Sequence, residues 1–211
     1  MTSLRLLDAE TSADLAAYLR RAKGVDTDGD VRLQSVGTVL AAWTCVVPGS
    51  GLLGSGLVLG LRTSGLAEAA DVDVTVPLGA VTDRLAHDET DLPLPPVESS
   101  PPWAALSPPR SGWELVGEVG ADDLVAAARD GIAEVATGAP TGSGAAAVAD
   151  LRRRVWGRST STVPPVPAGG AFGLHALGFL GHEGGERPEV TVRACGPWTR
   201  LTTPAGHVLT R

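Results

Sequence analysis

The stretch VVPGSGLLGSGLVLG, residues 46–60, decides between two fold classes. Within it, GSGLLG (49–54) fits the G-x-G-x-x-G pattern, in which a glycine turn and a helix N-terminus bind the pyrophosphate of a dinucleotide. That pattern needs a helix directly after the glycines and an acidic residue about 20 positions further on. Asp71 and Asp73 lie near that distance. Nucleotide binding by this loop is therefore one alternative.

The residues that follow the first glycines do not suit a helix. Segment 52–65 contains four glycines, and each costs roughly 0.8–1 kcal/mol relative to alanine inside a helix. Pro48 also stands where a strand would have to lead into the turn. We therefore interpret the loop as a hairpin connection between two buried strands, which favours an antiparallel sheet over a dinucleotide-binding fold.

A membrane span is the other interpretation of this region, because no charged residue occurs between Arg32 and Arg62. Pro48 and the glycines interrupt the interval, however, and would leave backbone groups unsatisfied in lipid. We expect buried strands and no contact with a membrane. The start of the chain has no apolar leader, and Cys45 and Cys195 lie far apart, so we expect a reduced, cytoplasmic protein.

Working outward from the hairpin, the hydrophobic pattern predicts further strands and helices. A helix with Thr11 or Ser12 as N-cap ends at Gly24 and comes before four strands, at 31–36, 38–47, 56–63 and 71–76. The later elements are a short helix, a strand, three more helices and a terminal hairpin, at 77–87, 113–119, 121–138, 144–157, 171–181 and 189–211. We infer an α+β fold with antiparallel sheets, about five helices and a C-terminal β-hairpin.

A proline-rich segment separates the two halves of the chain. Seven prolines between Pro93 and Pro109 prevent a packed helix and favour extended backbone. We divide the chain into an N-terminal α+β part with a four-stranded meander (1–90), a strap (91–112) and a C-terminal helical part that ends in the hairpin (113–211). We expect these parts to form one compact unit.

The charge of the chain is unevenly distributed. The net charge is −7, which argues against a dominant nucleic-acid surface. Residues 1–112 carry eight Lys or Arg against fourteen Asp or Glu, whereas residues 151–211 carry eight against three. We predict a surface for a protein partner or an anion at this basic end, formed by Arg152, Arg153, Arg154, Arg158, Arg193, Trp198 and Arg200. Alternatively, these arginines are solvated or pair with the acidic N-terminal half.

Signatures of catalysis and of metal binding are missing from the sequence. Neither G-x-S-x-G nor S-x-x-K occurs, and the histidines are scattered without an H-E-x-x-H motif, at His87, His175, His182 and His207. DTDGD (26–30) lacks the further oxygen ligands of a calcium loop. We predict no catalytic residue, no metal and no cofactor, and the sequence favours a protein that is not an enzyme.

Three helices followed by a hairpin also occur, in that order, in winged-helix DNA-binding proteins. The candidate recognition helix, 171–180, has no Arg, Lys, Asn or Gln for base edges or phosphates. The connection before it, 157–170, is also much longer than the roughly 3–4-residue turn of that motif. We therefore do not expect nucleic acid as a partner, and keep it as a third possibility through the basic C-terminal end.

Four stretches carry a family resemblance: GWELVGEV (112–119), VWGR (155–158), HALGFLG (175–181) and VRACGPWTRLTTPAGHVLTR (192–211). Together they resemble an uncharacterised family of actinobacterial proteins of about this size. The resemblance covers most of the chain. It implies a bacterial cytoplasmic protein and implies no activity, ligand or mechanism.

Our prediction of function from the sequence is a non-catalytic cytoplasmic protein that acts through contacts with another protein or with itself as a homodimer. The first alternative is a small-molecule or nucleotide binder, or an enzyme, that uses the loop Gly49–Gly56. The second is the nucleic-acid binding already named.

Overall fold

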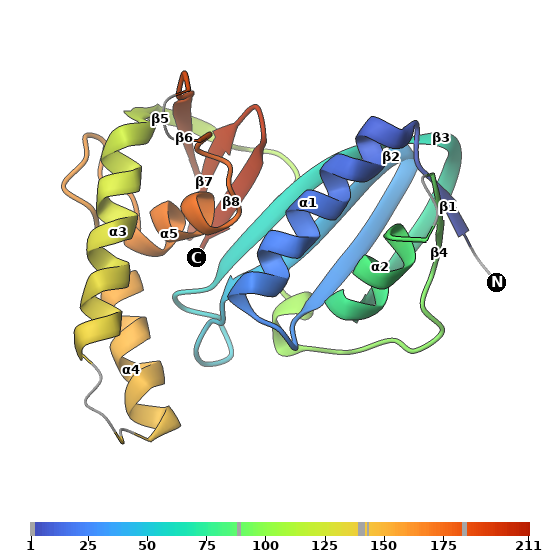
Figure 1. Ribbon diagram of the computed structural model, residues 1–211. Helices are drawn as coiled ribbons and strands as arrows, with labels where there is room; N and C mark the ends of the chain where they lie inside the picture. Colours follow the sequence, from blue (N-terminus) through green and yellow to red (C-terminus); the bar gives the residue numbers. More distant parts are fainter. Residues whose placement is uncertain (1–2, 88–89, 139–141, 143, 183–184) are drawn as a thin grey trace. The chain divides into compact units, whose positions relative to one another are not determined.

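The computed structural model describes residues 3–87, 90–138, 142, 144–182 and 185–211 (Figure 1). The chain folds into two compact units, each made of two separate segments. The first unit comprises Met1–Val46 and Leu59–Ser107, and the second comprises Val47–Val58 and Pro108–Arg211. The chain therefore passes from one unit to the other three times, and each unit is described by itself.

The first unit contains two long neighbouring strands, β2 (Asp30–Val47) and β3 (Val58–Pro77), where the sequence predicts four strands. The alternation of buried and more exposed residues stops in both strands at residues 36–39 and 67–69, which are all exposed. The backbone nevertheless remains extended through these exposed stretches. Within β2, Gly37 has left-handed backbone with a φ of 59°, a conformation that favours glycine.

Two helices, α1 (Ala9–Val25) and α2 (Leu78–Leu85), lie on one face of this strand pair (Figure 1). Helix α1 begins earlier than predicted, because Asp8 is its N-cap and accepts a 2.7 Å hydrogen bond from the backbone N–H of Thr11. It ends at Val25, one residue after the predicted stop at Gly24. The apolar face of α1 is buried and consists of Leu15, Tyr18, Leu19 and Ala22.

A second, small sheet in the first unit was not predicted. It pairs β1 (Ser3–Arg5) with β4 (Asp91–Pro93) in antiparallel register. The chain then continues through a proline-rich strap that contains one short 3₁₀ helix, η1 (Pro102–Ala105). Three-residue strands such as β1 and β4 are too short to show an alternating pattern in the sequence.

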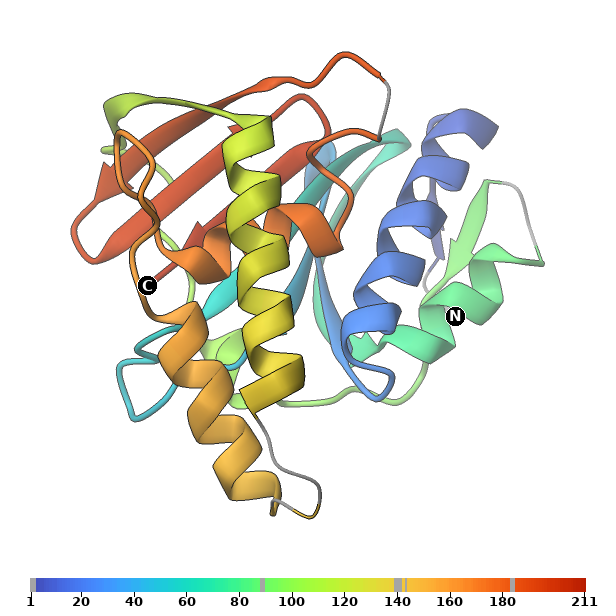
Figure 2. The ribbon, with the colours of Figure 1, turned by 60° about the vertical axis from the view of Figure 1, so that its left-hand side comes forward.

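The second unit is an antiparallel sheet covered on one face by helices (Figure 2). Its strands follow in the order β5 (Glu114–Gly120), β6 (Glu189–Cys195), β7 (Trp198–Thr203) and β8 (Gly206–Thr210). The helices are α3 (Ala121–Gly138), α4 (Ala145–Trp156) and α5 (Ala168–Ala176). The strand pairs β1–β4, β5–β6, β6–β7 and β7–β8 are antiparallel, and five α-helices occur among the described residues, so the predicted α+β class is confirmed.

Glycines let α5 pack close to this sheet, and their neighbours show which face of the sheet the helix covers. A Cβ on Gly170 would lie 2.7 Å from Cδ1 of Leu201, and one on Gly173 would lie 3.0 Å from Cγ1 of Val208. Leu201 and Val208 are paired across β7 and β8 and are buried, so their face is the helix-covered one. Because side chains alternate along a strand, Arg200 and Leu209 lie on the opposite face.

Candidate functional site

The glycine-rich segment Gly49–Gly56 forms a closed hairpin loop. Ser50 and Ser55 exchange two backbone hydrogen bonds, each 2.9 Å long. Three glycines have left-handed backbone, with φ values between 63° and 78°: Gly51, Gly54 and Gly56. Each glycine of the G-x-G-x-x-G pattern is therefore required by the turn, either by its positive φ or, at Gly49, by close approach to the backbone of Gly54.

The loop does not lead into a helix. After Leu57 the chain enters β3, so no helix N-terminus follows the glycines to bind a pyrophosphate. The side chains at the tip of the loop are apolar, with Leu52 99% and Leu53 67% exposed. The structure therefore supports the hairpin interpretation and gives the loop none of the geometry of a dinucleotide site.

The seven residues predicted to form one surface lie in two groups on opposite sides of the second unit's sheet. One group is at the end of α4 and just after it, on the helix-covered side: Arg152, Arg153, Arg154 and Arg158. We call these the helix-end arginines. The other group lies on β6 and β7, facing away from the helices: Arg193, Trp198 and Arg200.

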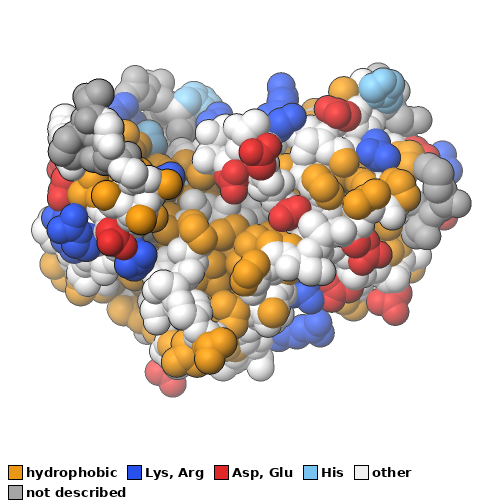
Figure 3. Space-filling model, turned by 90° about the horizontal axis from the view of Figure 1, so that it is seen from below, with side chains coloured by type: hydrophobic (Ala, Val, Ile, Leu, Met, Phe, Trp, Pro, Cys, Tyr) orange, Lys and Arg blue, Asp and Glu red, His pale blue; other side chains and the backbone are white. Residues whose placement is uncertain are grey.

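Two of the helix-end arginines are paired with acids. Arg153 makes an ion pair of 2.9 Å with Asp150 one turn earlier, and Arg158 makes one with Glu134 of α3. The side chains of Arg152 and Arg154 make no hydrogen bond or ion pair within the described part of the chain, although the carbonyl oxygen of Arg154 accepts a 3.2 Å bond from Nε of Arg158. Figure 3 shows Lys and Arg side chains in small groups, with acidic side chains among them, and no continuous basic stripe on the face in view.

The residues that gather on the open face of the sheet are Trp113, Arg193, Arg200 and His207, which we call the sheet-face cluster. Arg193 of β6 and Arg200 of β7 are directly opposite each other. The guanidinium carbon of Arg200 lies 4.6 Å from the ring centroid of Trp113, whose Nε1–H donates a 2.9 Å hydrogen bond to the carbonyl oxygen of Pro109. The indole therefore has a fixed position beside the arginine.

Sequence reasoning missed two members of this cluster and misjudged Trp198. Trp113 precedes β5, and only the cross-strand register places it near Arg200. His207 lies two residues from Leu209, the cross-strand partner of Arg200, so alternation along β8 puts it on the same face. Trp198 is only 4% exposed, with the Arg211 guanidinium 5.7 Å from its ring centroid, so it is a core residue and no exposed anchor.

The positive charges of the sheet-face cluster are not neutralised. Burial, together with the charges of Arg200 and Arg193, lowers the pKa of His207 below its usual 6.5. Burial and the charge of Arg193 also lower the pKa of Arg200. Nε of Arg200 is buried and has no hydrogen-bond acceptor in the described structure. The cluster therefore favours an anion over a further cation.

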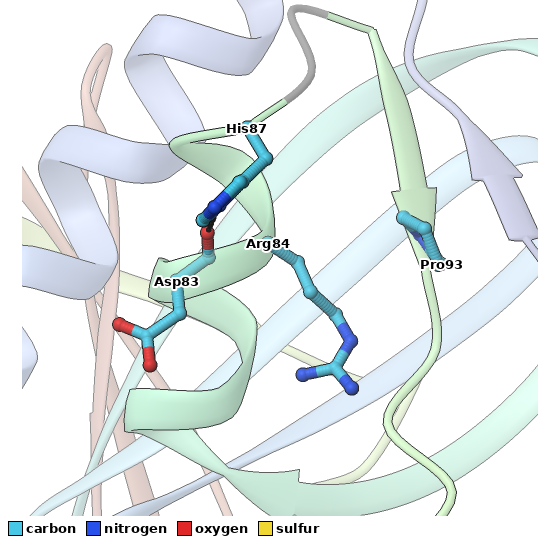
Figure 4. Close-up of a pocket in the computed structure, with 4 residues that line it drawn as sticks. All are labelled: Asp83, Arg84, His87 and Pro93. Atoms are coloured by element: carbon cyan, nitrogen blue, oxygen red, sulfur yellow. Dashed lines mark hydrogen bonds between the residues drawn. The ribbon is translucent and has the colours of Figure 1, made fainter.

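An apolar cavity of 280 Å³ lies in the first unit, lined by Asp83, Arg84, His87 and Pro93 (Figure 4). Nδ1 of His87 is 2.6 Å from the carbonyl oxygen of Asp83, whereas the Asp83 carboxylate and the Arg84 guanidinium point in different directions. These groups do not converge on a common point, so they do not form an acid–base pair for catalysis.

A polar network fixes the proline-rich strap to the first unit. Arg32 makes two 2.7 Å bonds to the carboxylate of Asp73, and its Nη1 donates to the carbonyl oxygen of Ala104 (2.8 Å) and to Oγ of Ser107 (3.1 Å). Hydrogen bonding to Asp73 raises the pKa of Arg32. Because its donors are already used inside the protein, Arg32 is a structural residue.

The described residues do not form a metal site, a reactive thiol or a membrane-spanning helix. No group of three or more His, Cys, Asp or Glu side chains that could hold a metal occurs among them. Cys45 and Cys195 are free thiols, and burial raises the pKa of Cys45 to about 12, which disfavours the reactive thiolate. No described helix has both the length and the apolar character that crossing a membrane requires.

Comparison with solved structures identifies the fold. The chain is similar to DNA polymerase sliding clamps of Pseudomonas aeruginosa, one crystallised with a ligand (TM-score 0.54, 14% identity) and one described as the DNA polymerase III subunit beta (TM-score 0.55, 15% identity). The DNA polymerase III beta subunit of Thermotoga maritima is similar too (TM-score 0.53, 14% identity). Each match covers 100% of this chain and 64% of the clamp chain. No curated protein matches the chain.

These similarities correct the function predicted from the sequence. We expected a protein that acts through protein contacts or homodimerisation, with the loop Gly49–Gly56 as an alternative site and nucleic acid as a remote third possibility. The fold, however, is that of DNA polymerase sliding clamps along the whole chain. The net charge of −7 describes the chain as a whole and not its separate basic surfaces, so it does not exclude a local contact with nucleic acid.

Two family models together cover almost the entire chain. Residues 1–105 match a domain of unknown function, DUF8010, and residues 108–211 match a second one, DUF8185. This agrees with the family resemblance noted from the sequence, whereas an actinobacterial source stays a prediction. The N-terminal half of the chain thus matches DUF8010 and the C-terminal half matches DUF8185, and both are domains of unknown function.

Proposed function

We propose that this protein is a DNA-associated protein that contacts the phosphate backbone of duplex DNA without reading its sequence. The observation that carries the proposal is the sliding-clamp fold, which extends over 100% of the chain. The chain spans 64% of the length of the clamps it resembles, so the proposal concerns association with DNA and not the whole activity of a clamp.

The chain offers a basic helix end in each unit for such contacts. In the first unit, α1 ends with Arg20, Arg21 and Lys23, and both arginines are exposed. In the second unit, the helix-end arginines include Arg152 and Arg154, which have no ion-pair partner in the described structure. Arg154 is exposed and Arg152 is half-buried, and guanidinium groups that reach solvent without acidic partners are suited to phosphate oxygens.

The same helices indicate that the contact is independent of base sequence. Neither α1 nor α4 contains Asn or Gln, the side chains that pair bidentately with adenine, so the arginines are left as their base-reading side chains, and we assign these to phosphate oxygens. The cations form small groups on a chain of net charge −7, so we expect weak binding, in the range of about 10⁻⁴–10⁻⁶ M that is typical of non-specific contacts.

The test is fluorescence anisotropy of a labelled DNA duplex as a function of salt. The variant Arg152→Gln/Arg154→Gln should weaken binding and reduce the slope of log K against log salt by about 2, since each phosphate contact contributes about 0.9. Arg20→Gln/Arg21→Gln should act in the same direction. Glutamine is a good helix former, so both variants should keep their helices.

A matched control removes two positive charges away from the helices. Arg5 and Arg110 are exposed, one on β1 and the other in the strap, and neither makes an ion pair within the described structure. Arg5→Gln/Arg110→Gln should leave the salt slope unchanged. If all three double variants bind DNA like the wild type, or if the wild type shows no binding at low salt, the proposal is wrong.

A further inference from the structure

The geometry points to a second anion site in this protein: the sheet-face cluster binds the phosphate group of a nucleotide or of single-stranded nucleic acid. The site lies entirely within the second unit, on the face of the sheet opposite to α3, α4 and α5, where Trp198 and Leu209 are buried and Leu115 of β5 is exposed. It does not depend on the proposed contact of the helix ends with duplex DNA.

The first reason is the position of the two arginines. Arg193 and Arg200 form a direct cross-strand pair, and the Cβ atoms of such pairs are about 4.5–5.5 Å apart. Like charges at this separation destabilise a sheet unless an anion lies between or above them. Two guanidinium forks at this spacing can both donate hydrogen bonds to one phosphate group.

The second reason is that the protein supplies no anion of its own. Neither arginine has an acidic partner in the described structure, and the buried Nε of Arg200 has no acceptor. Alternation places two acids on this face: Glu118, which stands in the next cross-strand row, opposite Thr191, and Glu189, four residues before Arg193 on β6. Both acids are exposed, and Glu118 is separated from His207 by β6 and β7, so burial and the charges of Arg200 and Arg193 still lower the pKa of His207.

The third reason is the aromatic surface beside the charges. Trp113 is half-buried and fixed by its bond to Pro109, and it holds the Arg200 guanidinium against its ring. Leu115, directly opposite Arg193 on β5, is 66% exposed, so the face is open to solvent there. An aromatic and apolar surface next to a phosphate site is what a nucleobase requires for stacking.

These observations favour a nucleotide phosphate over an acidic peptide. The phosphate of a phosphopeptide would bind the two arginines equally well, but recognition of that phosphate does not require the indole and the exposed leucine beside them. Trp113 and Leu115 are therefore the residues that favour a nucleotide as the ligand. Binding of a phosphopeptide is an alternative outcome of the test.

The experiment is an NMR titration of the full-length protein with four small ligands: deoxyadenosine monophosphate, deoxyadenosine, inorganic phosphate and a phosphoserine peptide. Deoxyadenosine monophosphate should shift the backbone amide signals of Arg193 and Arg200 and raise the pKa of His207 measured from its ring signals. Inorganic phosphate should act at the same residues more weakly, and deoxyadenosine should have no effect there. A short oligodeoxyadenylate, as a fifth ligand, distinguishes a single-stranded source from the free nucleotide.

Two double variants separate this inference from the proposed function. Arg193→Gln/Arg200→Gln should weaken binding of the mononucleotide by at least about tenfold, since hydrogen bonds to charged groups are lost, and should leave duplex binding unchanged. Arg152→Gln/Arg154→Gln should do the opposite. If the Gln variant is not folded, Arg193→Lys/Arg200→Lys keeps the charges, loses the forks and should still bind several-fold more weakly.

Several results would overturn the inference. One is the absence of any shift at Arg193, Arg200 and His207 with all of the phosphate ligands. Another is equal binding of deoxyadenosine and its monophosphate, which would show that the phosphate is not recognised. Binding of the phosphoserine peptide without the mononucleotide would replace the nucleotide by a protein ligand, and unchanged affinity in the Lys variant would exclude the two-fork geometry.

Discussion

Gly131 of α3 lies directly against the indole ring of Trp156 of α4. A Cβ on Gly131 would clash with Cζ3 of the ring and lie 2.8 Å from Cη2. The ring has little freedom to move, because it is 4% exposed and stacked on Phe172 with centroids 4.3 Å apart. This glycine therefore sets how closely α3 and α4 can pack.

We expect Gly131→Ala to destabilise the protein by about 1–2 kcal/mol in urea unfolding. Overpacking costs typically 1–3 kcal/mol, and the better helix propensity of alanine recovers about 1 kcal/mol at most. Gly24→Ala is the matched control, because nothing lies within 4 Å of a Cβ at that position of α1. It should stabilise the protein by up to about 1 kcal/mol, and a gain in both variants would show that Trp156 can move aside.

The strap of the first unit should loosen when the fork of Arg32 is removed. Arg32→Lys keeps the charge but cannot bond both oxygens of Asp73 and also Ala104 and Ser107. We expect a loss of about 1–3 kcal/mol and faster amide hydrogen exchange in residues 94–107. Arg110→Lys, at an exposed position in the strap, should change neither quantity. Unchanged exchange in both variants would contradict the anchoring role of Arg32.

His207 should make the stability of the protein depend on pH. Its pKa in the folded state is below the unfolded value of 6.5, so the unfolded chain takes up a proton that the folded protein resists. The stabilising effect is complete above pH 6.5 and is lost as the pH falls through the lower, folded-state pKa. In urea unfolding, His207→Gln should therefore lose less stability than the wild type on acidification. Identical slopes for the two proteins would contradict this assignment.

The loop Gly49–Gly56 should respond to backbone changes and tolerate changes at its tip. In Gly49→Ala the added Cβ would lie 2.7 Å from the backbone carbonyl of Gly54, so we expect a loss of about 1–3 kcal/mol. Leu52→Ser/Leu53→Ser should stay within about 0.5 kcal/mol, because both side chains are largely exposed. Thermal unfolding of the two variants measures the difference. A destabilised serine variant would mean that the tip packs against the protein.

The sequence predicted the helices better than the strands. Helix α3 occupies 121–138 as predicted, because its apolar stripe is regular and acids stand in its first turn. The length of β2 and β3 was not predicted, since Gly37 and the segment 64–70 interrupt the strand pattern in the sequence. Backbone hydrogen bonds continue through such stretches without any signal in the side chains.

The candidate sites were only partly predictable, because they depend on contacts between distant parts of the chain. The run Arg152–Arg154 is visible in the sequence, and so is the polarity of β6. The pairing of Arg193 with Arg200 needs the register of the hairpin, and the contact of Trp113 with Arg200 joins residues 87 positions apart. No local pattern encodes which face of the sheet the helices will cover.

The interleaved order of the two units has a consequence for attempts to express them separately. The DUF8185 match begins at residue 108, but the unit that contains it also includes Val47–Val58. In that segment Gly56 and Leu57 share two backbone hydrogen bonds with Arg211, and Val58 lies beside Gly169 and Gly173 of α5. A fragment that begins at residue 108 would therefore lack the backbone partners of Arg211 and the contact of Val58 with α5. A C-terminal fragment that contains the whole second unit needs residues 47–58 fused to residues 108–211, for example through a linker at the amino end of residue 108.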